Sequence, residues 1–187
     1  MKTIRKILPL IIAVPLGFGV ATLSAKVEPA IVPVASQWVV HVDFNQMRQT
    51  DLGQEMMAQI QAMHEEEHQG EIGSGINVAG LMAQIMETVG TVTAFGTEIT
   101  DDPEEMDGTA VIQGTEKMRI ISEGLVAHML LTEPDKLVEL TDMPFEAYKV
   151  NGEIVVGFPA EPIVLVGRSK EHLTGALEVY RGGGSSL

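Results

Sequence analysis

A two-residue turn between two apolar segments constrains the fold of this chain most strongly. Asn151-Gly152 separates residues 148–150 from residues 154–156. This dipeptide favours a type I′ turn, because both central residues need positive φ angles. The sequence therefore predicts a β-hairpin here, and with it a sheet that contains antiparallel strands.

Apolar patterns predict the other strands. In residues 37–44, Trp38 lies on one face while His41 and Asp43 share the other, which is the two-residue period of a half-buried strand. We expect Trp38 to anchor the core. Residues 163–166 are continuously apolar, which indicates a strand that is covered on both faces or lies centrally in the sheet. Two more strands, paired as a hairpin, are expected over residues 91–97 and 108–113.

Apolar residues at helical spacing predict the helices. Thr50 or Asp51 caps a first helix, and Ser169 caps a last one that runs through residue 181. A second helix begins after Asn77 and is stopped by Gly90. Its apolar stripe comprises Val78, Leu81, Met82, Ile85 and Val89, and the first helix has the stripe Leu52, Met56, Ile60 and Met63. Further helices are expected over residues 116–129 and, for one or two turns, 134–140.

The order of these elements predicts an α+β fold. A chain of 187 residues with 45% hydrophobic content fits one globular domain. We expect an antiparallel or mixed sheet of about six strands with helices packed mainly on one face. This domain is expected over residues 36–181, after an extended leader over residues 26–35. Residues 182–187 have the composition of a Gly/Ser linker, and we expect the reading frame to be truncated there.

The first 25 residues have the composition of a secretory signal. Lys2, Arg5 and Lys6 precede an apolar run over residues 7–23, and the small residues at Ser24 and after it suit cleavage. The alternative is an uncleaved anchor. Prolines and glycines interrupt the run, which lies at the short end of the ~17–25 residues that a spanning helix needs. A cleaved signal is favoured, so we expect no stable membrane insertion afterwards.

Charge excludes one class of partner. Three of the 12 basic residues lie in the signal and none of the 26 acidic ones does, so the remaining chain carries 26 acidic and 9 basic residues, a net −17. Such a surface repels phosphate backbones, so nucleic acid is not expected as a partner. The chain has no cysteine, which excludes thiol chemistry. Export without disulfides indicates a bacterial periplasmic or extracellular location.

One short motif has the pattern of a zinc site. His64-Glu65-Glu66-Glu67-His68 matches H-E-x-x-H, in which His64 and His68 would bind zinc and Glu65 would act as the catalytic base of a hydrolase. Helical geometry places Glu67 on the apolar stripe, so the helix is expected to have left the core. No third ligand follows at the usual spacing. A solvated, charged helix end is therefore the favoured interpretation.

Three other groups of side chains have weaker patterns of a functional site. His41 and Asp43 could form an acid–base pair, but no nucleophile accompanies them, and a polar sheet face explains them better. Six acidic residues over residues 98–107 could bind calcium, yet they lack EF-hand spacing, and a charged hairpin tip is favoured. Met56, Met57 and Met63, with His64 and His68, could hold copper, although core packing explains the methionines better.

Several short segments together resemble a group of uncharacterised exported bacterial proteins. They are Ser36–Asp43, the helix with Leu52-Gly53, Val92–Glu98 and Gly108–Ile112. The resemblance implies an exported α+β protein, often longer than this chain, and it supplies no catalytic residue.

These observations predict a non-enzymatic binding or structural protein of the cell envelope. Its partner would be an envelope protein or another envelope component, and no cofactor is expected. Two alternatives stay open. They are a zinc-dependent hydrolase through His64, Glu65 and His68, and a metal-binding protein that uses methionine and histidine side chains.

Overall fold

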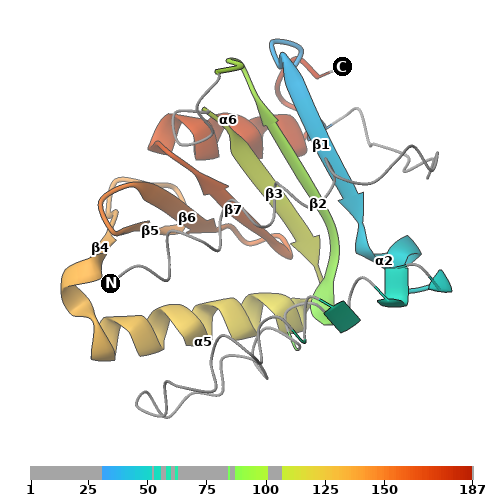
Figure 1. Cartoon of the computed structure of the whole chain (residues 1–187). Coiled ribbons are helices and arrows are strands. Elements are labelled where there is room, and N and C mark those ends of the chain that lie inside the picture. Colours follow the sequence, from blue (N-terminus) through green and yellow to red (C-terminus); the bar gives the residue numbers. More distant parts are fainter. Residues whose placement is uncertain are drawn as a thin grey trace.

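A computed structural model describes residues 31–51, 53–55, 58–59, 62, 84, 87–100 and 107–186 (Figure 1). Its elements are β1 (Trp38–Asp43), α2 (Phe44–Met47), β2 (Val89–Gly96), β3 (Thr109–Gly114), α5 (Glu116–Thr132), the 3₁₀ turn η4 (Pro134–Lys136), β4 (Leu137–Glu139), β5 (Glu146–Val150), β6 (Ile154–Phe158), β7 (Ile163–Gly167) and α6 (Lys170–Tyr180). The strands form one seven-stranded sheet in the order β1-β2-β3-β7-β6-β5-β4. Every neighbouring pair is antiparallel.

The α+β class and the antiparallel sheet are thus confirmed. Asn151 has a φ of 53° and Gly152 a φ of 74°, as the type I′ turn between β5 and β6 requires. β7 is the central strand, as its apolar sequence predicts. The sheet has seven strands rather than about six, because residues 137–139 extend as β4 and only η4 is helical in the segment 134–140.

The cap expected at Thr50 is present. Its Oγ1 accepts a hydrogen bond of 3.0 Å from the amide of Gly53. The end of the second helix was predicted incorrectly, because Gly90 does not stop it. Thr88 is the last helical residue described, and Val89 and Gly90 already belong to β2. The other stripe residues of these two helices lie outside the described residues.

The two long helices of the described chain lie on opposite faces of the sheet (Figure 1). Alternate residues of β7 separate two cores, because Ile163 and Leu165 pack with α6 whereas Val164 packs with α5. The prediction that helices gather mainly on one face is therefore wrong for these two. The α6-side core contains Phe95, Val111, Val155, Ile163, Leu165, Leu173, Ala176 and Leu177, and the α5-side core contains Val89, Met118, Val126, Leu137, Tyr148, Phe158 and Val164.

The folded domain extends beyond the expected limits of residues 36–181. Ile31 and Val32 are buried in the α6-side core, because a pair of β-branched side chains gains more from that core than from water. Pro33 forms an antiparallel bridge with Ser186. The amide of Val34 donates a bond of 3.1 Å to the Ser185 carbonyl. Part of the expected leader and part of the expected linker therefore pair with each other.

Trp38 is partly exposed and lies in β1, at the edge of the sheet. Its indole ring occupies the space beside Gly96 and Gly108, where an added Cβ would approach ring atoms within 2.6 Å. The indole N–H donates to the carbonyl of Glu98 over 2.9 Å. Trp38 belongs to neither core cluster, so its expected role as a core anchor is wrong, and its ring instead joins β1 to the loop between β2 and β3.

Candidate functional site

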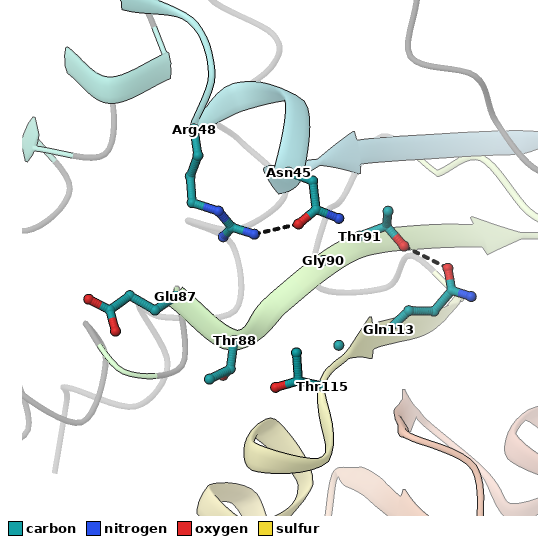
Figure 2. Close-up of a pocket in the computed structure, with 9 residues that line it drawn as sticks. Asn45, Arg48, Glu87, Thr88, Gly90, Thr91, Gln113 and Thr115 are labelled. Atoms are coloured by element: carbon teal, nitrogen blue, oxygen red, sulfur yellow. Dashed lines mark hydrogen bonds between the residues drawn. The ribbon is translucent and has the colours of Figure 1, made fainter.

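A polar cleft of about 310 Å³ opens at the end of the sheet where β1 ends, β2 begins and β3 ends (Figure 2). It is lined by Asn45, Arg48, Glu87, Thr88, Gly90, Thr91, Gln113, Gly114 and Thr115. All nine side chains are polar or absent. The volume lies at the lower end of the range for small-molecule sites.

A β-bulge shapes the floor of this cleft. Val89 pairs with Gly114 and Thr91 with Gln113, so Gly90 is an extra residue in β2 without a partner in β3. Bulges bend a strand locally and often occur beside functional sites. A Cβ at Gly90 would lie 3.1 Å from Asn45 Nδ2 and 3.4 Å from the Gln113 carbonyl oxygen. The missing side chain therefore keeps the floor open.

Two side chains reach the cleft from α2 and from Arg48, the residue at its C-terminal cap (Figure 2). Arg48 Nη2 donates to Asn45 Oδ1 over 2.7 Å and to the Val89 carbonyl over 3.0 Å. The helix is positioned by Asp43, whose carboxylate accepts the Gln46 amide at 2.9 Å as an N-cap. These two hydrogen bonds hold the guanidinium over the start of β2.

The opposite side of the cleft carries an amide and a hydroxyl group. Gln113 Oε1 accepts a bond of 2.6 Å from Thr91 Oγ1, so the Gln113 amide nitrogen is turned away from that contact. Thr115 is the N-cap residue of α5, yet its side chain makes no capping bond. Gly114, just before the helix, leaves room for the side chain of Met118, because a Cβ at Gly114 would lie 2.6 Å from Met118 Sδ.

Charges in the cleft balance. Arg48 contributes one positive charge and the exposed Glu87 one negative charge. The remaining polar side chains are amides and hydroxyls, which both donate and accept hydrogen bonds. The arrangement suits recognition of a neutral polar molecule better than of an ion.

The predicted pair His41 and Asp43 shares a face of β1, but each side chain has a partner of its own. His41 Nδ1 and Thr93 Oγ1 are 2.8 Å apart, and Asp43 caps α2. Thr93 is fully buried, so its hydroxyl cannot attack a substrate in solvent. The polar, structural interpretation of this pair fits the geometry.

A second imidazole–carboxylate pair was not foreseen from the sequence. His172 Nε2 in α6 lies 3.2 Å from Asp107 Oδ2, at the end of the acidic loop. The other ring nitrogen, Nδ1, is buried without a hydrogen-bond partner, so no hydroxyl nucleophile contacts it. This pair therefore joins the loop to α6 and does not form a catalytic set.

The remaining sequence predictions fall mostly outside the described residues. These include His64, Glu65 and His68, together with Met57, Met63, residues 101–106 of the acidic loop and the signal segment. Within the described ranges, no group of three or more His, Asp or Glu side chains could hold a metal ion. Among those same residues, no helix is long and apolar enough to cross a membrane.

The cleft itself was missed because its residues are distant in sequence. Gly90 was interpreted from the sequence only as a helix stop, and Thr115 lies 25 residues further along the chain. Only the pairing of β2 with β3 brings them together. Comparison with known protein families, curated proteins and solved structures finds no match to this chain.

Proposed function

We propose that this protein is a non-enzymatic binding protein of the bacterial cell envelope, and that it binds a small neutral molecule rich in hydroxyl groups. The proposal is supported above all by the polar cleft between α2, β2, β3 and α5. Its export signal supports the location.

Hydrogen-bonding groups on two sides of the cleft support this ligand class. The amides of Asn45 and Gln113, the Thr115 hydroxyl and the Arg48 guanidinium come from α2, β3 and the start of α5. A sugar or polyol offers donors and acceptors around its whole surface, so it would satisfy such a mixed set. An anion would meet Arg48 but also Glu87, in a chain that is strongly acidic.

The absence of a reactive constellation among the described residues supports a binding role over an enzymatic one. Catalysis by a side-chain nucleophile needs that nucleophile within hydrogen-bond reach of a base. The hydroxyl beside His41 is buried, and the imidazole of His172 has the Asp107 carboxylate beside Nε2 and no hydrogen-bond partner at Nδ1 among the described residues. Neither group lines the cleft.

The test is saturation-transfer NMR on residues 26–187 with glucose, galactose and inositol, and a separate titration with inorganic phosphate. We expect a signal from at least one neutral probe. Gly90→Val should remove it, because Gly90 has no positive φ and the new side chain would fill the floor. Thr115→Ala should weaken binding by about tenfold, or ~1.4 kcal/mol, without loss of stability, because the hydroxyl makes no capping bond.

Gln37→Ala is the matched control for Gln113→Ala, since Gln37 is an exposed glutamine outside the cleft. Gln113→Ala should weaken binding and Gln37→Ala should not. If phosphate binds and none of the neutral probes does, the proposed neutral ligand is wrong and the cleft binds an anion. No binding of any probe would count against the cleft as a ligand site.

The hydrolase and the methionine–histidine site remain predictions from the sequence. They are tested together by measuring zinc and copper per chain after purification without chelating resin, in the wild type and in His64→Ala/His68→Ala. One equivalent of zinc that disappears in the variant would favour the hydrolase. Copper at that stoichiometry would favour the alternative metal-binding protein.

A further inference from the structure

The carboxamide of Asn45, at the cleft, has one half engaged and one half open. Its oxygen Oδ1 accepts a hydrogen bond of 2.7 Å from Arg48 Nη2. Its nitrogen Nδ2 has no hydrogen-bond partner in the part of the chain that the structure describes. Figure 2 shows the same division, with the oxygen turned towards Arg48 and the nitrogen on the other side. The group that Asn45 leaves open is therefore a pair of N–H donors.

Arg48 fixes this orientation of the amide. A guanidinium carries N–H donors and no acceptor, and it is not deprotonated in proteins. It can therefore face only the oxygen of a carboxamide, because a half-turn of the Asn45 amide would bring N–H against N–H. Arg48 is itself held at the start of β2 by its bond of 3.0 Å to the Val89 carbonyl. Asn45 Nδ2 is thus a donor whose direction is set by a neighbouring side chain.

The open donor faces the floor of the cleft. A Cβ at Gly90 would lie 3.1 Å from Asn45 Nδ2, so the nitrogen lies beside the space that the missing side chain leaves. Asn45 is exposed, so a molecule from solvent can reach this nitrogen. A ligand oxygen above Gly90 can accept a hydrogen bond from Nδ2, which needs an N···O distance of about 2.7–3.2 Å.

We propose that Asn45 determines which ligands the cleft accepts, by donating a hydrogen bond from Nδ2 to a ligand oxygen above Gly90. Arg48 is the positioning residue, because it holds the amide in the donating orientation. The inference rests on the proposed binding function of the cleft and adds a requirement to it. The ligand must present an acceptor here, such as a hydroxyl or carbonyl oxygen, and an ammonium group, which only donates, is rejected.

The side-chain amide signals of Asn45 in the NMR spectrum test the contact directly. In isotope-labelled residues 26–187, the probe that binds among glucose, galactose and inositol should shift the Nδ2 proton signals of Asn45. It should leave those of Asn151 unchanged, because Asn151 is exposed in the β5–β6 turn and does not line the cleft.

Asn45→Ala removes the donor and should weaken binding of that probe about threefold to tenfold, the effect of one neutral hydrogen bond. Gln46→Ala is the matched control, because Gln46 is the next residue of α2, is also an exposed amide and does not line the cleft. It should bind the probe as the wild type does. Both variants should melt close to the wild-type temperature, since alanine is favourable in a helix.

A double-mutant cycle tests the positioning role of Arg48. Arg48→Ala should weaken binding, because the Asn45 amide can then turn its oxygen towards the ligand. In an Asn45→Ala background, Arg48→Ala should cause no further loss. Equal losses in both backgrounds would mean that Arg48 acts independently of Asn45, and would overturn its positioning role.

Deoxyfluoro derivatives of the binding probe test the direction of the hydrogen bond, because carbon-bound fluorine accepts weakly and does not donate. At one ring position the fluoro derivative should bind the wild type more tightly than the deoxy derivative, and Asn45→Ala should bind the two equally. The absence of this difference in the wild type would overturn the inference. So would unshifted Asn45 signals with a bound probe, and both results would leave the proposed function standing. No binding of any probe would overturn the inference and the proposed function together.

Discussion

Tyr148 carries the largest change in acidity among the described residues. Its hydroxyl donates to Glu146 Oε1 over 2.7 Å. This hydrogen bond, with burial of the phenol and the nearby negative charge, raises the pKa of Tyr148 to about 12. The ring also packs edge-on against Phe158, with centroids 6.5 Å apart. The raised pKa means that the folded state favours the protonated phenol. The contribution of the Tyr148 hydroxyl to the free energy of unfolding should therefore depend on pH.

Tyr148→Phe tests that dependence, since it keeps the ring contact and removes the hydroxyl. Below pH 10 the variant should unfold about 1 kcal/mol more easily, because one hydrogen bond to an exposed carboxylate is lost. The difference should vanish as the pH rises from 10 to 12, where the wild-type phenol deprotonates in both states. Urea unfolding at pH 8 and pH 11 measures it. A difference that is constant with pH would contradict the assignment.

Single residues were predictable where the local backbone decides their role. Asn151-Gly152 forms its turn, and Thr50 and Ser169 cap helices through their own side chains. These roles involve neighbours within three residues. His41 was not predictable in the same way, because its partner Thr93 comes from another strand.

The strands differ in how strongly they depend on packing. β7 lies at the centre of the sheet and is covered on both faces, whereas β4 is a three-residue edge strand. Leu165→Ala, in β7, should destabilise the protein by about 2–5 kcal/mol, because a fully buried side chain leaves a cavity. Val138→Ala, in β4, should change stability by less than about 0.5 kcal/mol. Equal effects in denaturant unfolding would refute the central position of β7.

Two similar sequence patterns lead to helices on different faces. Residues 111–117 and 164–170 both run from a strand through a glycine and a cap into a helix. The first leads into α5 and the second into α6, which pack against opposite sides of the sheet. The local pattern predicts each helix correctly but contains no information about the face. Boundaries such as the start of β2 at Val89 were missed for a related reason, since strand pairing competes with helical spacing there.

The two ends of the described chain contribute to the stability of the whole molecule. A chain that begins at Ser36 loses Ile31, Val32 and the bridge from Pro33 to Ser186. We expect it to be about 3–6 kcal/mol less stable than residues 26–187, from the apolar burial of two side chains. Urea unfolding of both proteins measures this difference.

A matched pair of point variants supports that measurement. Val32→Ala removes a fully buried side chain and should be clearly destabilising, whereas Val34→Ala alters an exposed one and should be nearly neutral. If both variants and the shortened chain matched the wild type, residues 31–35 would not belong to the core.

The sequence by itself determined the class of the fold, the β5–β6 hairpin, the caps and most strands, because each rests on interactions between residues close along the chain. Only the tertiary structure decided the strand order, the faces of α5 and α6 and the cleft around Gly90. These depend on which distant segments pair, and pairing is set by the burial of both faces of one sheet. A periodic pattern shows that a side chain is buried or exposed, but not which segment it meets.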